Sequence, residues 1–283
     1  MGKQRMQSPS SINTYLQCPR KYFFQYKLRI PTSPSIHLVR GSVAHLALEK
    51  FYSLVPEVIG DEYRSHLKTV LLQLLDKYWK ESKPEFDQLD MTSQQIEEFY
   101  FETRKMMENH LELIISRLDA LTSKGLSFPE AFKQVSPEVE VEYLSWDKYV
   151  KGFIDVVENV DGTTRLMDYK TSKRNKLTDA YKLQLAIYAL LYKEKHGSLP
   201  GEVGIYFLKF PGDEGELTLK TDDELVKLAE FQIEQIHMST TSDTIGDYPL
   251  QKGPLCNWCD YYDYCYKDKP IPEEPFPSRY KKN

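Results

Sequence analysis

The chain has 283 residues, of which 41% are hydrophobic and 28% charged, a composition typical of globular proteins and unlike that of collagen-like or wholly disordered chains. It shows no apolar signal core at the N-terminus and no apolar run near the roughly 20 residues that cross a bilayer, so we expect a cytoplasmic protein with no membrane partner. The net charge of −5 is unevenly spread, because residues 1–55 carry eight Lys or Arg and a single acid, Glu49. This basic end predicts a face that attracts phosphate, although a solvated amphipathic helix has the same pattern.

The first half of the chain is predicted to be almost entirely helical. Its segments place apolar residues at helical spacing, and the first begins with Ser and Pro capping residues. The five predicted helices cover residues 8–18, 20–28, 41–55, 62–80 and 93–124. Residues 56–136, which hold the last two of these helices, are interpreted as a helical insertion.

The period of the pattern changes near Pro137. Residues 138–146 (EVEVEYLSW) alternate acidic and apolar side chains, which is typical of a half-exposed strand. Asp161-Gly162 predicts a tight hairpin turn between the next two strands. These and the later strands cover residues 149–157, 164–170, 202–210 and 216–219, with helices at 180–195 and 222–237. We therefore expect an α/β fold with a central mixed sheet of three to five strands flanked by helices.

The hairpin carries two carboxylates. Asp155 lies in an apolar strand, where a carboxylate costs free energy unless it is paired or binds a cation. On the next strand Asp168 and Lys170 are two residues apart and project to the same face. The turn can bring Asp155 near Asp168, and two carboxylates beside a lysine suit Mg²⁺ or Mn²⁺. From this pattern alone, a cross-strand salt bridge with Lys170 is the alternative.

Two helices carry polar residues among apolar ones. His45 and Glu49 are four residues apart and share a helix face, and Gly41 permits close backbone approach at the start of that helix. Gln184 and Tyr188 are also four residues apart, on an otherwise apolar helix. Such polar groups need partners, and ordinary hydrogen bonding within a core explains both pairs as well as a functional site does.

Four cysteines form a pattern typical of a metal site. Cys256, Cys259 and Cys265 lie close together as C-x2-C-x5-C, and Cys18 precedes Pro19 near the other end of the chain. Disulfides are disfavoured in a reducing cytosol. Four thiolates suit either zinc or a [4Fe–4S] cluster, and the spacing does not decide between them.

Taken in order, these motifs resemble the RecB-type branch of the PD-(D/E)XK nuclease superfamily. The motifs are Gly41-x-x-x-His45, Gly152-Phe-Ile-Asp155, Asp168-Tyr-Lys170 and Gln184-x-x-x-Tyr188. The four cysteines are similar to those of its iron–sulfur members, which include AddB-type nuclease domains and CRISPR-associated adaptation nucleases. The resemblance implies a restriction-endonuclease-like core in one nuclease domain, residues 1–283, that contains the 56–136 insertion.

The resemblance also implies roles for the site residues. The implied ligands of Mg²⁺ or Mn²⁺ are His45, Asp155, Asp168 and the carbonyl oxygen of Tyr169. Lys170 orients the attacking water and helps to deprotonate it, while Gln184 and Tyr188 position Lys170 or the DNA backbone. Glu49 is a candidate contact for a second metal.

At the two ends of the chain the resemblance favours iron over zinc. It implies a structural [4Fe–4S] cluster that joins Cys18 to the 256–265 segment. We expect residues 268–283 to form an extended tail. The predicted contacts to the DNA backbone are Arg20, Lys21, Lys27 and Arg29.

The implied function is metal-dependent cleavage of DNA by an exonuclease acting on single-stranded ends, in DNA repair or recombination. A helicase or CRISPR adaptation proteins are the expected partners. Three alternatives are a CRISPR adaptation nuclease, a DNA-binding partner subunit without catalysis, and a zinc-clamped structural protein. The sequence contains no G-x-x-x-x-G-K-[ST] phosphate loop of a helicase.

Overall fold

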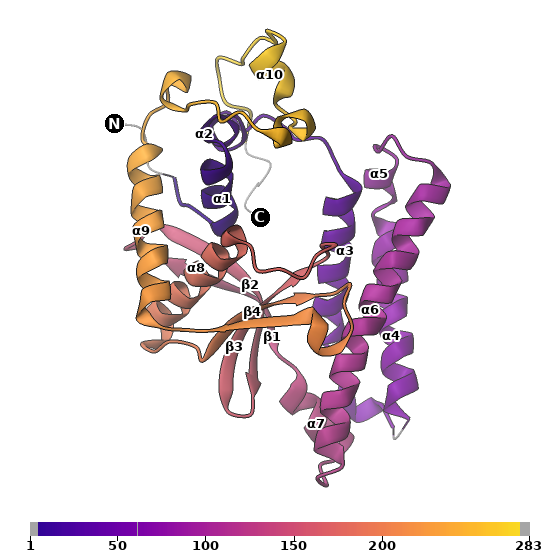
Figure 1. Ribbon diagram of the computed structural model, residues 1–283. Helices are drawn as coiled ribbons and strands as arrows, with labels where there is room; N and C mark the ends of the chain where they lie inside the picture. The colour runs from indigo at the N-terminus through magenta and orange to yellow at the C-terminus, as the bar shows by residue number, and fades with distance from the viewer. Residues whose placement is uncertain (1–4, 61, 278–283) are drawn as a thin grey trace.

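A computed structural model describes residues 5–60 and 62–277, and its centre is a five-stranded sheet (Figure 1). The strands lie side by side in chain order. They are β1 (Glu138–Ser145), β2 (Val150–Val160), β3 (Thr163–Lys170), β4 (Glu202–Phe207) and β5 (Glu216–Lys220). β3 and β4 are parallel and the other neighbours are antiparallel. The predicted α/β fold with a mixed sheet is therefore confirmed.

The β2–β3 hairpin fixes the register on which the site depends. Asp161 and Gly162 have φ angles of 50° and 80°, as a two-residue type I′ turn requires. Pairing then runs from Val160 opposite Thr163 toward the other end of the two strands. Continued in the same register, it sets Asp155 against Asp168, as the sequence predicts.

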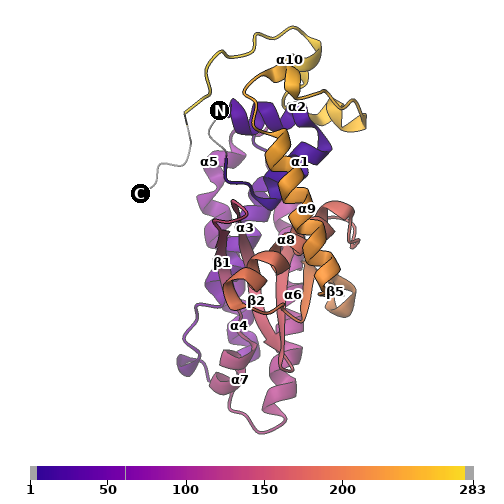
Figure 2. The same ribbon diagram turned by 90° about the vertical axis from the view of Figure 1, so that its left-hand side faces the viewer.

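One face of the sheet is covered by α8 (Asp179–His196) and α9 (Asp223–Ser239), as Figure 2 shows. Ile154, Leu166 and Val203 of the strands pack with the apolar side of α8. α1 (Pro9–Gln17) joins this layer through Ile12. The short helix η3 (Gly212–Gly215) connects β4 to β5.

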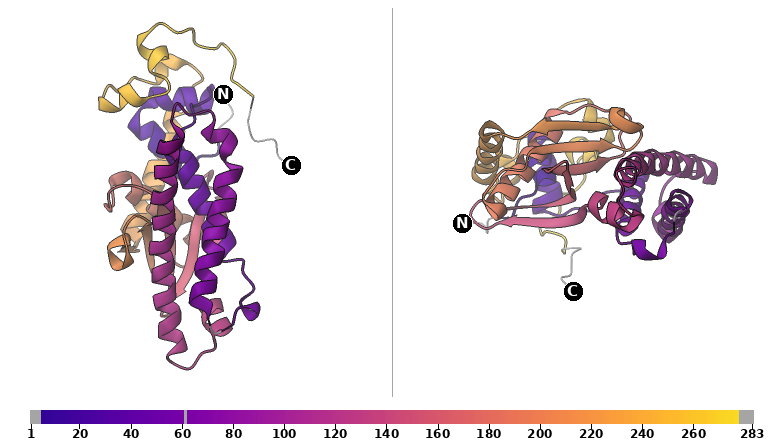
Figure 3. Two further views of the ribbon diagram at one scale, coloured as in Figure 1. Left: turned by 90° about the vertical axis from the view of Figure 1, so that its right-hand side faces the viewer. Right: turned by 90° about the horizontal axis from the view of Figure 1, so that it is seen from below.

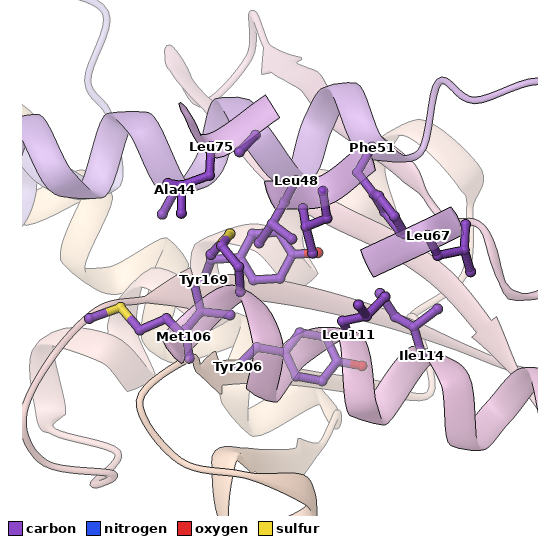
Figure 4. Close-up of a cluster of buried hydrophobic side chains, with 14 of the residues drawn as sticks. Ala44, Leu48, Phe51, Leu67, Leu75, Met106, Leu111, Ile114, Tyr169 and Tyr206 are labelled. Atoms are coloured by element: carbon purple, nitrogen blue, oxygen red, sulfur yellow. The ribbon is translucent and has the colours of Figure 1, made fainter. Parts of the chain in front are cut away.

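The opposite face packs against α3 (Ile36–Phe51) and α6 (Ser93–Thr122). Figure 4 shows Tyr169 and Tyr206 of the sheet among Leu48, Met106 and Leu111 of these helices. The two layers bury separate apolar clusters, and the candidate site lies between them, at the middle of β2 and the end of β3.

The segment predicted as an insertion is helical and lies along one side of the sheet (Figure 3). Its longest helix, α6, packs against both α4 and α7. Around α6 the segment comprises η2 (Pro56–Val58), α4 (Tyr63–Glu81), α5 (Lys83–Phe86) and α7 (Phe128–Val135). The sequence did not predict α5 or α7, because each is too short to show a helical period.

The start of α3 corrects the sequence analysis. The helix begins at Ile36, where the Ser35 side chain accepts a hydrogen bond from the Leu38 amide. Gly41 therefore lies inside the helix, and a Cβ added there meets no atom within 4 Å. The expected close backbone approach at Gly41 is wrong.

Residues 19–27 and 245–266, which come from opposite halves of the sequence, lie side by side (Figures 1 and 2). Tyr22, Phe23 and Phe24 pack against Tyr248 and Tyr261 in a third buried cluster. The elements concerned are α2 (Pro19–Tyr22), the π-helix η1 (Phe23–Lys27), η4 (Ile245–Asp247), η5 (Pro254–Trp258) and α10 (Tyr262–Tyr266). The helix predicted over 20–28 therefore forms over residues 19–27, with π-helical hydrogen bonding in its second part.

Residues 268–277 of the predicted tail form neither helix nor strand, and the Phe276 amide donates a 2.8 Å hydrogen bond to the carbonyl of Leu28. Residues 278–283, also predicted as tail, lie outside the described residues. Within the described ranges, every helix is too short or too polar to cross a membrane.

Candidate active site

A histidine and two carboxylates converge where α3 crosses the sheet. His45 Nδ1 lies 3.4 Å from Asp155 Oδ2 and 4.0 Å from Glu140 Oε1. One potential ligand atom from each of the three residues lies within 4.8 Å of the other two. His45 Nε2 also lies 3.1 Å from the carbonyl oxygen of Tyr169, and the Tyr169 amide donates to Asp155 at 2.8 Å. His45, Glu140 and Asp155 are a candidate metal site, and we refer to them below as the metal-binding cluster.

An irregular stretch of backbone shapes this cluster. Residues two apart in a regular strand share a face, yet Ile154 packs with α8 and Val156 packs with α3. The change of face therefore occurs at Asp155. Glu140 lies between the residues paired with Val156 and Ile154 and has a φ of 51°. A positive φ in a residue other than Gly costs on the order of 1–3 kcal/mol and is found preferentially at functional sites.

Asp168 and Lys170 form a second group, on the side of α8. Lys170 makes an ion pair with Asp168 Oδ2. The other carboxylate oxygen accepts from Gln184 Nε2 at 2.5 Å and from the Tyr188 hydroxyl at 3.3 Å. Gln184 also donates to Tyr188 at 2.8 Å. The predicted pair on α8 therefore contacts Asp168, and any effect on Lys170 passes through that carboxylate.

Negative charge is in excess between the two groups. Burial raises the pKa of Asp168, and the nearby charge of Asp155 raises it further. The same two causes raise the pKa of Glu140. Burial lowers the pKa of His45, but the hydrogen bond and charge of Asp155 outweigh it and raise that pKa to about 8. Burial also lowers the pKa of Lys170, but the charge and hydrogen bond of Asp168 outweigh burial and raise that pKa. A cation among these carboxylates would relieve their mutual repulsion.

The sequence analysis missed Glu140. It is one of three acids that alternate with apolar residues at the start of β1, at positions 138, 140 and 142. The one available signal was that β1 precedes the carboxylate-bearing hairpin and pairs with β2. Glu49, the candidate for a second metal, accepts a 2.7 Å hydrogen bond from Lys50, and its charge contributes to the raised pKa of Glu140, so that role stays a prediction.

The four cysteines line one cavity of about 290 Å³ between the two ends of the chain. Burial raises the pKa of both Cys259 and Cys265, and the charge of Cys18 contributes to each shift. The thiols of distant segments are thus close enough to interact, as the resemblance implies. Phe24 and Trp258 are among the apolar residues of the cavity wall.

Of the basic residues predicted to bind DNA, Lys21 lines this cavity, and the charge of Arg20 acts on Cys265 in its wall. Arg20 Nε donates to the Tyr248 carbonyl at 2.7 Å, and Lys27 pairs with Asp243 at 2.7 Å. Lys21 donates to Gln17 at 3.0 Å, and Arg29 is exposed with a φ of 55°. Arg20 and Lys27 are therefore already engaged within the chain.

Comparisons with known proteins agree with this geometry. Residues 7–266 match the family model of the PD-(D/E)XK nuclease superfamily. The chain is 23% identical to the Gene 69 protein of Mycobacterium phage L5, over 92% of this chain and 96% of that protein. It is 26% identical to one subunit of the ATP-dependent helicase/deoxyribonuclease of Clostridium perfringens, over 76% of this chain but only 21% of that subunit.

A solved structure shares the fold. It is the crystal structure of a candidate exonuclease from Eubacterium rectale, with a TM-score of 0.51 and 14% identity over 97% of this chain and 91% of that one. The family match extends from before α1 to the end of α10 and so includes every cysteine and every residue of the metal-binding cluster. The chain belongs to the PD-(D/E)XK nuclease superfamily.

Proposed function

We propose that the protein is a Mg²⁺- or Mn²⁺-dependent deoxyribonuclease that degrades DNA as an exonuclease from single-stranded ends. The observation that carries this proposal is the metal-binding cluster of His45, Glu140 and Asp155 beside the Asp168–Lys170 pair. Membership of the nuclease superfamily supports phosphodiester hydrolysis. A phosphodiester is itself an anion, so hydrolysis needs positive charge at this acidic position.

The proposed metal ligands are the carboxylates of Glu140 and Asp155, the imidazole of His45 and the carbonyl oxygen of Tyr169. Carboxylate and carbonyl oxygens are preferred by Mg²⁺, and imidazole is compatible with Mn²⁺. A bound divalent cation neutralises the phosphate and lowers the pKa of its water ligand. Asp155 is fixed for this role, because the Tyr169 amide holds one of its oxygens. We retain Asp168 as a further ligand, since its charge and that of Asp155 influence each other.

Lys170 is assigned to the attacking water: its ammonium group orients that water and, as a nearby positive charge, helps it to lose a proton. Its ammonium group is placed by Asp168 and lies 5.5 Å from the centre of the Tyr181 ring. Gln184 and Tyr188 hold the far oxygen of Asp168 and so limit the positions open to Lys170. We propose that these two residues position the catalytic groups and do not react.

We also propose that Cys18, Cys256, Cys259 and Cys265 bind a [4Fe–4S] cluster. A cavity of about 290 Å³ is larger than a single zinc ion needs and suits a cluster of several atoms. Four thiolates are the usual ligands of such clusters. Because hydrolysis transfers no electrons, the cluster is assigned to structure, and it would join the two ends of the chain.

The pathway is proposed from the relatives. Similarity to part of a helicase/deoxyribonuclease supports a helicase partner and a role in DNA repair or recombination. The iron–sulfur resemblance is shared with CRISPR adaptation nucleases, and adaptation proteins are the alternative partners. Gene neighbourhood distinguishes these two pathways.

The test is cleavage of end-labelled single- and double-stranded DNA by anaerobically purified protein with Mg²⁺ or Mn²⁺. We expect products that shorten from the ends of single-stranded DNA, and no products with a chelator or with the Asp155→Asn variant. Binding of DNA without cleavage under every metal condition would favour the alternative of a partner subunit without catalysis.

A further inference from the structure

A group of cations lies beside the metal-binding cluster and has no part in the mechanism above. Arg40 and His37 come from the start of α3, Lys173 from the loop after β3, and Lys209 from the loop after β4. Arg40 and Lys209 both bond the carboxylate of Glu102, and a terminal nitrogen of Arg40 lies 3.4 Å from His37 Nδ1. Besides burial, the charges of Arg40, Lys173 and Lys209 lower the pKa of His37. These residues therefore come together from the start of α3 and from the loops that follow β3 and β4.

Arg40 is the fixed member of this group. Its side chain is only 3% exposed, and its guanidinium lies 5.1 Å from the centre of the Phe99 ring of α6. One terminal nitrogen donates to the Thr171 carbonyl at 3.1 Å. Among the described residues, no acceptor lies within hydrogen-bonding distance of the buried Arg40 Nε. Arg40 is therefore a buried, oriented cation with an unused donor.

The distance to the metal-binding cluster suits a nucleic acid strand. His45 contacts the carbonyl of Tyr169, and Arg40 contacts the carbonyl of Thr171 two residues further along the same segment. Two residues of extended chain span about 6.6 Å. A phosphate held at Arg40 would thus be close to one held at the metal-binding cluster, as neighbouring phosphates of one strand are.

A carboxylate from the helical insertion occupies this group of cations in the structure. Glu102 of α6 accepts from Arg40 at 2.9 Å and from Lys209 at 2.7 Å. The hydrogen bond to Lys209 lowers the pKa of Glu102 despite its partial burial, and the charges of Arg40 and Lys173 add to this shift. With 47% of its side chain exposed, Glu102 lies at the surface, where a competing anion can reach its partners.

We propose that Arg40, Lys173 and Lys209 form a subsite for a DNA backbone phosphate next to the reacting one, and that Glu102 fills this subsite until DNA displaces it. The inference rests on the proposed nuclease function, because it names the path of the substrate into that site. Through Glu102, the helical insertion would control how readily DNA occupies this subsite.

The test is binding of fluorescent oligothymidine in a chelator, measured by anisotropy over a series of salt concentrations. Glu102→Gln frees the cations, so we expect roughly three- to tenfold tighter binding. The salt dependence should steepen by about 0.7 in slope, the value for one phosphate contact in single-stranded DNA. Lys173→Ala and Lys209→Ala should weaken binding and flatten the slope by a similar amount.

Glu57→Gln is the matched control, because it removes the same charge from a surface ion pair with Lys133 elsewhere in the insertion. It should bind as the wild type does. If the variants shift binding but the wild type cuts no DNA, the subsite stands and the nuclease proposal fails. If the wild type cuts DNA but Glu102→Gln and Lys173→Ala bind as Glu57→Gln does, the subsite is overturned. Wild-type protein that binds no DNA overturns both.

Discussion

At the scale of residues, the cluster around Asp155 combines side chains that a sequence can reveal with one that it cannot. Asp155, Asp168 and Lys170 are conspicuous because they are charges within apolar strands. Glu140 is one acid of an alternating series, and its selection depends on the left-handed φ at that position. The alternating sequence gives no reason to prefer Glu140 over Glu138 or Glu142. Only the positive φ at Glu140 distinguishes its position in the strand.

Lys170→Ala separates the proposed catalytic role from a purely structural one. If Lys170 acts on the water, we expect cleavage to fall by about 10²- to 10⁴-fold while Mn²⁺ and DNA binding persist. If the Asp168–Lys170 pair is only a buried salt bridge, the variant strands a carboxylate and loses about 3–5 kcal/mol of stability. Cleavage rate and melting temperature are to be measured on the same preparation.

A variant that melts far below the wild type, or that folds and cuts at the wild-type rate, would contradict the assignment of Lys170. Tyr188→Phe serves as a graded comparison. It removes only the hydroxyl that lies 3.3 Å from Asp168, so its loss of activity should be smaller than that of Lys170→Ala.

At the scale of elements, periodicity predicts the strands and the longer helices but not the short helices α5 and α7 or the start of α3, and it does not predict how elements are connected through buried charge. Glu158 of β2 bonds Arg117 of α6 at 2.8 Å and the Tyr206 hydroxyl of β4 at 2.6 Å. Arg165 of β3 lies 3.7 Å from the same carboxylate. These residues are far apart in sequence and have no shared pattern. They nevertheless join the helical insertion to three strands of the sheet.

Glu158→Ala tests this connection. The change removes the most buried carboxylate of the network and leaves Arg117 and Arg165 paired with the more exposed Glu216 and Glu202. We expect the free energy of unfolding to fall by about 3 kcal/mol. The control is Glu142→Ala, which removes an exposed ion pair with Lys151 and should cost about 1 kcal/mol or less. Chemical denaturation measures both. Equal small losses for the two variants would show that the buried network adds little.

At the scale of the whole molecule, we propose that the chain is one nuclease domain whose ends are joined through the cysteines. The pairing of Cys18 with the 256–265 segment could be predicted, because four thiols at such positions resemble a known metal site. The surroundings could not: the aromatic contacts between Tyr22 and Tyr248 depend on tertiary packing. The basic start of the chain packs against that segment, where Arg20 bonds the Tyr248 carbonyl and Lys27 pairs with Asp243, and its contact with DNA stays a prediction.

The joining of the two ends predicts a colour and a stability change. Anaerobically purified protein should be brown, with about four iron and four sulfide per chain. Cys18→Ala should bleach it and lower its melting temperature, because the ends are then held only by their aromatic contacts. Stoichiometric zinc without sulfide would contradict the cluster and favour a zinc clamp.

The central claim is that His45, Glu140 and Asp155 hold the divalent ion on which cleavage depends. Titration of Mn²⁺ into wild type, Glu140→Gln and Glu142→Gln, with cleavage measured at each concentration, tests it most directly. We predict that Glu140→Gln weakens Mn²⁺ binding by more than about tenfold and shifts the Mn²⁺ dependence of cleavage equally, while Glu142→Gln matches wild type. Unchanged Mn²⁺ binding and cleavage in Glu140→Gln would contradict the proposed metal site.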